Sequence, residues 1–211
     1  MSAAILAGGL ARRLGGADKA ALVVGRARII DRQLAALAAV ADDIRIIAND
    51  RARYAGLQIP VIADAIAGAG ALGGLYSALL DARHDRVLIL ACDLPFITAA
   101  LLQRLVAESG GLDGVDARID AVVPRSGRGL EPLCALYHRR CADAARARIE
   151  RGELKVAGLL AGLRVRELGP ELLAPYDEGS LFENVNTPHD YARARGWVEL
   201  NEKPSEDRIT E

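Results

Sequence analysis

The chain has 211 residues, a length that fits one domain able to bury a substantial core. It is 51% hydrophobic but only 4% aromatic, which favours alternating strands and helices over an aromatic-rich β-sandwich. The formal net charge is −1, whereas a broad nucleic-acid-binding surface normally leaves a basic excess, so we expect no nucleic acid partner.

The cysteine and histidine counts argue against two further kinds of site. Three cysteines form no CxxC pair, and an odd number does not fit a disulfide framework. Three histidines, none at metal-ligand spacing from another, argue against a zinc site. The N-terminus lacks the pattern of a signal peptide, and every apolar run is shorter than the roughly 18–20 residues that cross a bilayer. We therefore expect a cytoplasmic protein without a membrane partner.

Apolar segments alternate with helical patterns in the first half of the chain. Buried strands are predicted at residues 3–7, 44–48, 60–63, 87–91 and 121–124. Ile30, Leu34 and Leu37 share one face of a predicted helix, and two more helices are predicted over 72–80 and 99–106, the latter with Thr98 as N-cap. This alternation implies parallel pairing with right-handed crossovers, and hence an open α/β sheet covered by helices on both faces.

The second half of the chain is less regular. Strands are predicted at residues 132–137 and 163–168, and helices at 141–151, 156–160 and 188–195. Thr187 is the expected cap of the last helix, with Pro188 at its first position. The polar stretch after Trp197 is typical of a frayed tail. We expect a single domain over residues 1–197 and a polar C-terminal tail over residues 198–211.

Glycine or polar residues follow each of the first four predicted strands: Gly8-Gly9, Asn49-Asp50, Asp64 and Asp93. Ligands of open α/β sheets bind beyond the carboxyl ends of the strands, so we expect these groups to converge on one rim. Asp93 lies just before Pro95, which prevents the strand from continuing. A lone carboxylate there suits Mg²⁺, which completes its shell with phosphates and water, although turn-capping aspartates and helix-capping asparagines are common alternatives.

The loop after the first strand contains two glycine pairs with basic residues between and after them. It reads Leu6-Ala7-Gly8-Gly9, then Arg12-Arg13, Gly15-Gly16 and Lys19. The glycines let the backbone approach a ligand, and the basic side chains supply charge for phosphates. The spacing fits neither a P-loop nor a G-x-G-x-x-G fingerprint. The loop indicates a nucleoside triphosphate site, with a tight structural connection as the alternative.

Taken together, these residues resemble a known family. The N-terminal loop is similar to that of nucleotidyltransferases that transfer a nucleoside monophosphate from a triphosphate. Paired Gly8-Gly9 and the distant Asn184-Val185-Asn186-Thr187-Pro188 resemble the molybdenum cofactor guanylyltransferases, and further matches lie at residues 70–74, 92–96 and 131–133. The chain departs from the family at Ala71, usually Pro, and at Leu14, usually Met.

The resemblance implies a Rossmann-like three-layer αβα sandwich with a mostly parallel central sheet. It also implies transfer of GMP from GTP to molybdenum-molybdopterin, with release of pyrophosphate and Mg²⁺ as cofactor. By similarity, Asn184 and Asn186 would lie on the pterin side, and Asp93 would hold Mg²⁺. The residues expected to bind GTP are Leu6, Ala7, Gly8, Gly9, Lys19, Asn49, Asp64 and Asp93.

The acceptor phosphate is already anionic, so the reaction needs no general base. Catalysis must come from alignment and from neutralising charge as pyrophosphate leaves. We expect Lys19 and Arg13 to stabilise that charge and Asp93 to hold the metal, which makes these three the catalytic residues. Cys92 is expected to be a small buried residue rather than a nucleophile.

Two other interpretations remain open at this stage. The first is a transferase of the same fold with another base or acceptor, such as a molybdopterin cytidylyltransferase or a sugar-phosphate nucleotidyltransferase. The second is a non-catalytic protein that delivers the cofactor. The expected partners are GTP, molybdenum-molybdopterin, other cofactor-biosynthesis proteins, and apo-molybdoenzymes or their chaperones.

Overall fold

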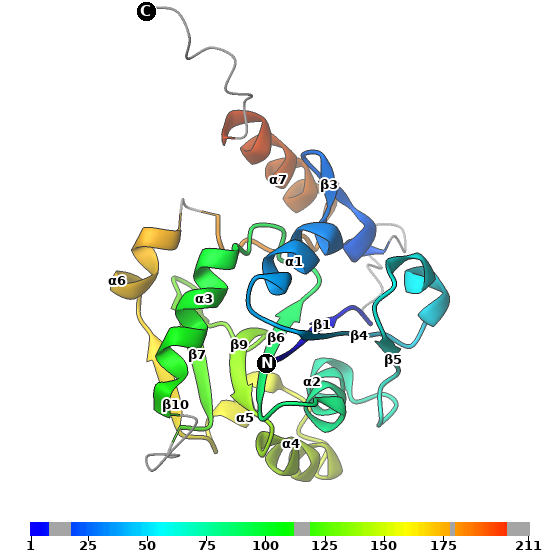
Figure 1. Cartoon of the computed structure of the whole chain (residues 1–211), viewed down its shortest axis with the longest axis vertical. Coiled ribbons are helices and arrows are strands. Elements are labelled where there is room, and N and C mark those ends of the chain that lie inside the picture. The colour runs from blue at the N-terminus through cyan, green and yellow to red at the C-terminus, as the bar shows by residue number, and fades with distance from the viewer. Residues whose placement is uncertain (9–17, 112–118, 178–179, 202–211) are drawn as a thin grey trace, which may run out of the picture.

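A computed structural model of the chain describes residues 1–8, 18–111, 119–177 and 180–201 (Figure 1). Gly9 and Arg13, two of the expected site residues, lie outside these ranges. The strands of the main sheet are β1 (Ser2–Leu6), β4 (Asp43–Ile47), β5 (Val61–Ile62), β6 (Arg86–Ala91), β7 (Ala121–Ser126), β8 (Gly129–Leu130), β9 (Cys134–His138) and β10 (Val165–Leu168). A separate hairpin pairs β2 (Val23–Val24) with β3 (Ala27–Arg28).

The main sheet is mixed, and within the described residues it has eight strands. Seven of them run in the order β10-β7-β9-β6-β1-β4-β5, and β8 pairs with β7 alone. β1 pairs in parallel with both β4 and β6, and β4 pairs in parallel with β5. Only the β9 pairs and the β7–β8 pair are antiparallel. The prediction of a mostly parallel α/β sheet is confirmed.

Helices cover both faces of the sheet (Figure 1). They are α1 (Ile29–Ala38), α2 (Gly70–Asp81), α3 (Ala99–Ala107), α4 (Cys141–Glu150), α5 (Val156–Leu160), α6 (Pro170–Leu173) and α7 (Pro188–Asn201), with 3₁₀ turns η2 (Lys19–Ala21), η3 (Arg51–Leu57), η4 (Glu108–Gly111) and η5 (Ala174–Tyr176). None of these helices is long and apolar enough to cross a membrane.

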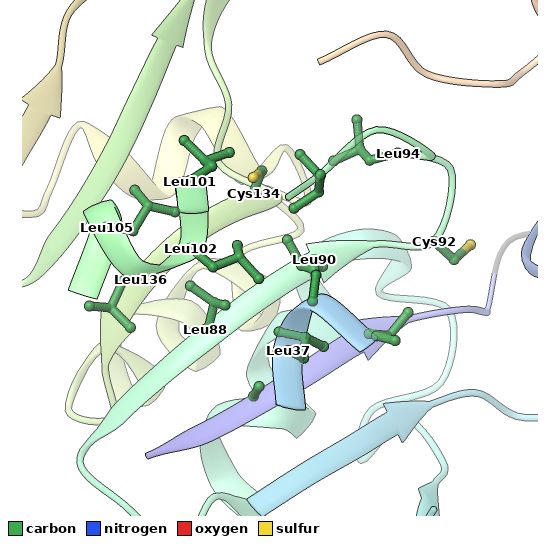
Figure 2. Packing of buried hydrophobic residues seen from close by; sticks show 14 of the residues in the cluster. Leu37, Leu88, Leu90, Cys92, Leu94, Leu101, Leu102, Leu105, Cys134 and Leu136 are labelled. Carbon is green, nitrogen blue, oxygen red and sulfur yellow. The ribbon is translucent and has the colours of Figure 1, made fainter. Parts of the chain in front are cut away.

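The sheet separates two hydrophobic cores. On one face, leucines from α1, α3, β6 and β9 pack into one cluster with Cys92 and Leu94 of the turn after β6 (Figure 2). On the other face, α2, α4 and α5 cover the opposite side chains of the same strands. Each fully buried leucine contributes roughly 1.5–3 kcal/mol through the hydrophobic effect. The sheet is therefore held rigidly, and its strand ends provide fixed positions for a site.

Most predicted elements agree with the structure to within two residues, and the capping prediction for Thr98 is confirmed because its side chain accepts from Leu101 N at 3.3 Å. Thr187 also caps its helix, since its hydroxyl accepts from Asp190 N at 3.1 Å. The largest difference is α7, which continues to Asn201, past the expected boundary at residue 197. Val198 is buried there against the hairpin, which keeps the helix ordered. The division into one domain and a polar tail stays a prediction.

The order of the strands creates a crevice beside β1. From β1 the chain moves to β4 and β5 on one side, and then returns to β6 on the other side of β1. The connections after β1 and β6 therefore leave the same edge of the sheet in opposite directions. Such a reversal of strand order is the usual position of the ligand site in open α/β sheets.

At the opposite end of the sheet, Asp120 ties together the starts of three elements. Its carboxylate accepts from Arg140 Nε at 2.8 Å, from Arg164 Nε at 3.0 Å and from Arg164 N at 2.9 Å. Hydrogen bonds from Arg164 lower the pKa of Asp120 well below its usual value, with Arg140 adding to the effect. The Asp120 carboxylate thus links the start of β7 to Arg164, which precedes β10, and to Arg140, which precedes α4.

Replacing Asp120 with Asn should lower the free energy of unfolding by about 1–2 kcal/mol at pH 7, because charged hydrogen bonds are lost. The depressed pKa makes this stabilisation complete above the unfolded value of 3.8 and progressively lost as the pH falls below it. Urea unfolding of both chains at pH 7 and pH 3 tests this. A difference in stability that is the same at both pH values would contradict the role of the charge.

Candidate functional site

A cavity of about 240 Å³ lies at the crevice beside β1. Its walls come from the turn after β1, the turn after β6, the N-terminus of α2 and the segment after β5. Expected site residues among its lining are Leu6, Gly8, Lys19, Asp64 and Asp93. The predicted convergence of strand ends on one rim is therefore present in the structure.

Lys19, Asp93 and Asn186 form a polar cluster at this cavity. Lys19 Nζ lies 3.3 Å from Asp93 Oδ2, and it also donates to Asn186 Oδ1. The Lys19 and Asp93 side chains are 16% and 17% exposed, so both charges are mostly shielded from water yet reach the cavity. Val185 N donates to the backbone oxygen of Asp93 at 2.9 Å, which anchors the downstream motif to the turn after β6.

Asn49 and Asp64 form a reciprocal pair at the ends of β4 and β5. Asn49 Nδ2 donates to Asp64 Oδ2 at 2.9 Å, and Asp64 N donates to Asn49 Oδ1 at 3.0 Å. Asn49 thus orients Asp64 and does not cap the turn that follows it, which has Asp50 at its N-cap. A Cβ added to Gly74 would lie 3.8 Å from Asp64 Oδ1, in ordinary contact. The second carboxylate oxygen therefore lies beside α2, where it can accept from a ligand.

Asn184 lies apart from the Lys19 cluster. Its Oδ1 accepts from Arg128 Nη1 at 3.3 Å. It also lines a second hollow of about 160 Å³ with Phe96 and Trp197, whose ring centroids lie 4.6 Å apart. The turn before α7 is fixed instead by Asp190, which accepts from the backbone of residues 186 and 187. Asn186 therefore belongs to the Lys19 cluster, whereas Asn184 lines the second hollow.

The N-terminus of α2 adds backbone groups to the cavity. Its N-cap, Ala69, makes no side-chain hydrogen bond to the helix. Gly70 has a φ of +58°, a conformation that favours glycine, and a Cβ on Gly73 would lie only 2.7 Å from the Ala69 Cβ. Ala71, where the related sequences usually have proline, is in the first turn of the helix. Proline is tolerated there, so the exchange leaves the helix start intact.

Gln33 is a buried polar residue that the sequence analysis missed. It is 1% exposed, and its Nε2 donates to Ala91 O at 2.8 Å and to Leu94 O at 3.0 Å. These two carbonyls flank Cys92 and Asp93, so α1 holds the turn that carries the carboxylate. Its position in the sequence indicates that it is buried, because Gln33 follows Ile30 by three residues and lies on the apolar face of the helix.

Cys92, the thiol next to Asp93, is not activated as a nucleophile. Burial, with the nearby Asp93 charge adding to its effect, raises the pKa of the Cys92 thiol to about 12. The expectation that Cys92 is a small buried residue therefore agrees with its surroundings. Within the described ranges, no cluster of three or more His, Cys, Asp or Glu side chains could hold a metal ion. Asp93 alone fits a hard cation that takes its remaining ligands from phosphates and water.

Comparisons with known proteins give a consistent result. The sequence profile of the MobA-like NTP transferase domain matches residues 3–168. A curated molybdenum cofactor guanylyltransferase from Desulfosudis oleivorans is 33% identical over 195 residues, which cover 92% of this chain and 94% of that protein.

Two solved structures extend the comparison. Molybdopterin-guanine dinucleotide biosynthesis protein A from Archaeoglobus fulgidus has a TM-score of 0.79 and 27% identity, with 95% of this chain and 100% of that chain covered. A Mycobacterium tuberculosis protein crystallised with manganese has a TM-score of 0.63 at 17% identity, with 92% and 97% covered, and shares the fold.

Exchanging Gln33 for Met should loosen the turn that carries Asp93. The variant keeps the side-chain volume but loses two hydrogen bonds, which should lower the free energy of unfolding by about 1–2 kcal/mol. The amide of Val185 donates to Asp93 O and reports on the turn. Its hydrogen exchange should accelerate more than the change in global stability explains. Gln103→Met, at an exposed position of α3, is the control. Acceleration that only follows global stability would make Gln33 an ordinary core residue.

Proposed function

The chain belongs to the MobA-like NTP transferase family, and we propose that it transfers GMP from GTP to molybdenum-molybdopterin with release of pyrophosphate. The predicted family and enzyme class, a nucleotidyltransferase, are confirmed by these relatives. The observation that carries the proposal is the Lys19–Asp93–Asn186 cluster at the reversal of strand order. It places one cation and one anion at the point where a triphosphate would lie between β1 and β6.

We assign the triphosphate to the cavity beside β1. Among the described residues, nothing lies within 4 Å of a Cβ added to Gly8, which leaves room for phosphate oxygens there. Lys19 can reach those oxygens, and the uncapped first turn of α2 presents backbone amides to the same cavity. Arg13 stays a proposed phosphate ligand on sequence grounds alone, together with Gly9.

We assign the base and ribose to the β4–β5 side of the cavity. Leu6 supplies an apolar surface there, and the Asn49–Asp64 pair supplies a fixed acceptor oxygen. Guanine carries a ring N–H and an amino group on one edge, which are donors that such an oxygen can accept. Asp64, oriented by Asn49, is therefore the proposed acceptor from the nucleotide.

A divalent cation, for which we propose Mg²⁺, fits the Asp93 carboxylate. When bound, this ion would neutralise phosphate charge and help to align the triphosphate. Lys19 Nζ lies 3.3 Å from the same carboxylate. Its ammonium group would therefore lie beside the departing pyrophosphate and stabilise its charge. Asn186 also accepts from Lys19 Nζ, so Lys19 has a second partner beside the carboxylate that would hold the ion.

The chemistry then requires alignment more than proton transfer. A terminal phosphate of the acceptor attacks the α-phosphorus, and pyrophosphate leaves in line with it. The attacking oxygen already carries charge, so the reaction needs neither a general base nor the Cys92 thiol, whose pKa is raised by burial. Asn184 and the hollow that it lines beside Trp197 are the proposed pterin side of the site.

Replacing Lys19 with Ala should lower kcat/KM by about 30- to 1,000-fold, the effect of losing about 2–4 kcal/mol of transition-state stabilisation. The assay is pyrophosphate release with GTP, Mg²⁺ and molybdenum-molybdopterin. Lys155→Ala, which removes an exposed lysine before α5, should retain wild-type activity. An unchanged rate in the Lys19 variant would remove this residue from the mechanism.

Replacing Asp93 with Asn should raise the Mg²⁺ concentration for half-maximal activity by about tenfold or more, because a neutral amide is a weaker ligand for a hard cation. A titration of activity against Mg²⁺ measures this. Asp143→Asn, at an exposed position of α4, is the matched control. The assignment of the metal to Asp93 would be wrong if the variant and the wild type titrated alike.

Parallel assays with GTP and CTP decide between the proposed reaction and its alternatives. Turnover of GTP with molybdenum-molybdopterin is the expected result, whereas preference for CTP or for a sugar phosphate would identify another transferase of this fold. Binding without turnover would favour a delivery protein. Direct transfer of product to apo-molybdoenzymes or their chaperones is a further proposal, tested by pull-down with those proteins. The cytoplasmic location stays a prediction.

A further inference from the structure

Tyr54 connects the two ends of the segment that carries the glycine loop. Its hydroxyl lies 3.2 Å from the carbonyl oxygen of Ala7 and 3.1 Å from Asp18 Oδ1. Ala7 comes directly before Gly8, and Asp18 comes directly before Lys19. We propose that Tyr54 is a positioning residue, which holds Gly8 and Lys19 at the spacing that a triphosphate requires.

The hydroxyl is built into the protein rather than exposed at its surface. Tyr54 is 4% exposed, and its ring packs in the core on the α1 side of the sheet. A buried hydroxyl without a partner is costly, so its contacts with the two loop ends are maintained in the folded state. Burial and the Asp18 charge raise the pKa of Tyr54, which keeps the phenol protonated and able to donate.

The phenol has one proton and two acceptors within reach. Asp18 is the stronger acceptor because hydrogen bonds to an ionised oxygen are roughly twice as strong as neutral ones. Asp18 Oδ1 also accepts from Ala20 N at 3.0 Å, which fixes the start of η2 and hence the backbone of Lys19. Loss of the phenol hydroxyl would therefore leave Asp18 less firmly held, and through Asp18 it would loosen the backbone of Lys19.

The same tyrosine links this arrangement to the base side of the cavity. Tyr54 belongs to η3, which begins at Arg51, two residues after Asn49. The element that holds the loop ends is thus continuous with the residue that orients Asp64. Pre-ordering of such contacts increases affinity because less conformational freedom is lost when the ligand binds. The expected effect of Tyr54 is therefore on nucleotide affinity.

The proposal is tested with Tyr54→Phe, which keeps the ring and removes the hydroxyl. Tyr191→Phe is the control, because Tyr191 OH on α7 also donates to a carbonyl oxygen, that of Val23 at 2.9 Å, but contacts neither Ala7 nor Asp18. Calorimetric titration with a non-hydrolysable GTP analogue and Mg²⁺ should show affinity reduced about 5- to 20-fold in Tyr54→Phe and unchanged in the control. Thermal unfolding should show similar, small shifts in both.

A double-mutant cycle identifies the route. If Tyr54 acts through Asp18, the effects of Tyr54→Phe and Asp18→Ala on affinity should not add, since either change breaks the same bond. Hydrogen exchange of the Ala20 amide gives a readout without nucleotide, and it should accelerate in Tyr54→Phe but not in Tyr191→Phe. Wild-type affinity and wild-type exchange in Tyr54→Phe would overturn the proposal.

The inference rests on the proposed function only in that the cavity binds a nucleoside triphosphate. The two can fail separately. If the wild-type chain binds CTP and not GTP, the proposed reaction is wrong, and the same comparison of variants is then made with a CTP analogue. If the wild-type chain binds the nucleotide and Tyr54→Phe binds it equally well, the reaction stands and the positioning role is wrong.

Discussion

The parallel pairing of β1 with both β4 and β6 is the constraint on which the site depends. Because the strand order reverses at β1, the turns after β1 and β6 leave the sheet side by side and diverge. Cys92 N donates to Leu6 O at 3.2 Å, which continues this pairing into the turns themselves. Gly8 and Asp93 therefore start from adjacent backbone positions. The spacing of Gly8 and the Asp93 carboxylate is thus set by the hydrogen-bonded pairing of β1 and β6.

Turns lack the hydrogen-bond ladder of a strand, so charges placed on them need support from other elements. Gln33 supplies it to the Asp93 turn by donating to the carbonyls on either side, and Val185 N donates to Asp93 O. Lys19 is held by two oxygens, those of Asp93 and Asn186. The site thus carries its charges in fixed positions before any ligand arrives, which is the condition for electrostatic stabilisation in a shielded crevice.

The rim of the site could be predicted from the sequence because it follows from local patterns. Apolar segments locate the strands, and parallel pairing places Asn49, Asp64 and Asp93 at one edge without further information. Gln33 and the contact of Asn186 with Lys19 could not be predicted this way. Both are hydrogen bonds between groups 58 or more positions apart in the sequence, from Gln33 to a backbone oxygen and from Lys19 to Asn186, and no periodicity encodes such contacts. The length of α7 was missed for the same reason, because its last turn is kept by packing on the hairpin.

The buried polar residues around this site stabilise geometry at some cost in packing. An apolar residue in place of Gln33 would bury as well, and the unpartnered Gln33 Oε1 shows that the amide is imperfectly satisfied. The Gln33 Nε2 group, however, donates to two carbonyl oxygens on either side of Cys92 and Asp93. Loss of the amide would leave both carbonyls without this donor, which lowers stability as well as loosening the turn that carries the carboxylate. In this fold, a turn that carries a charged group is therefore supported by a buried polar side chain that donates to its backbone. Such side chains contribute to the site although they do not touch the ligand themselves.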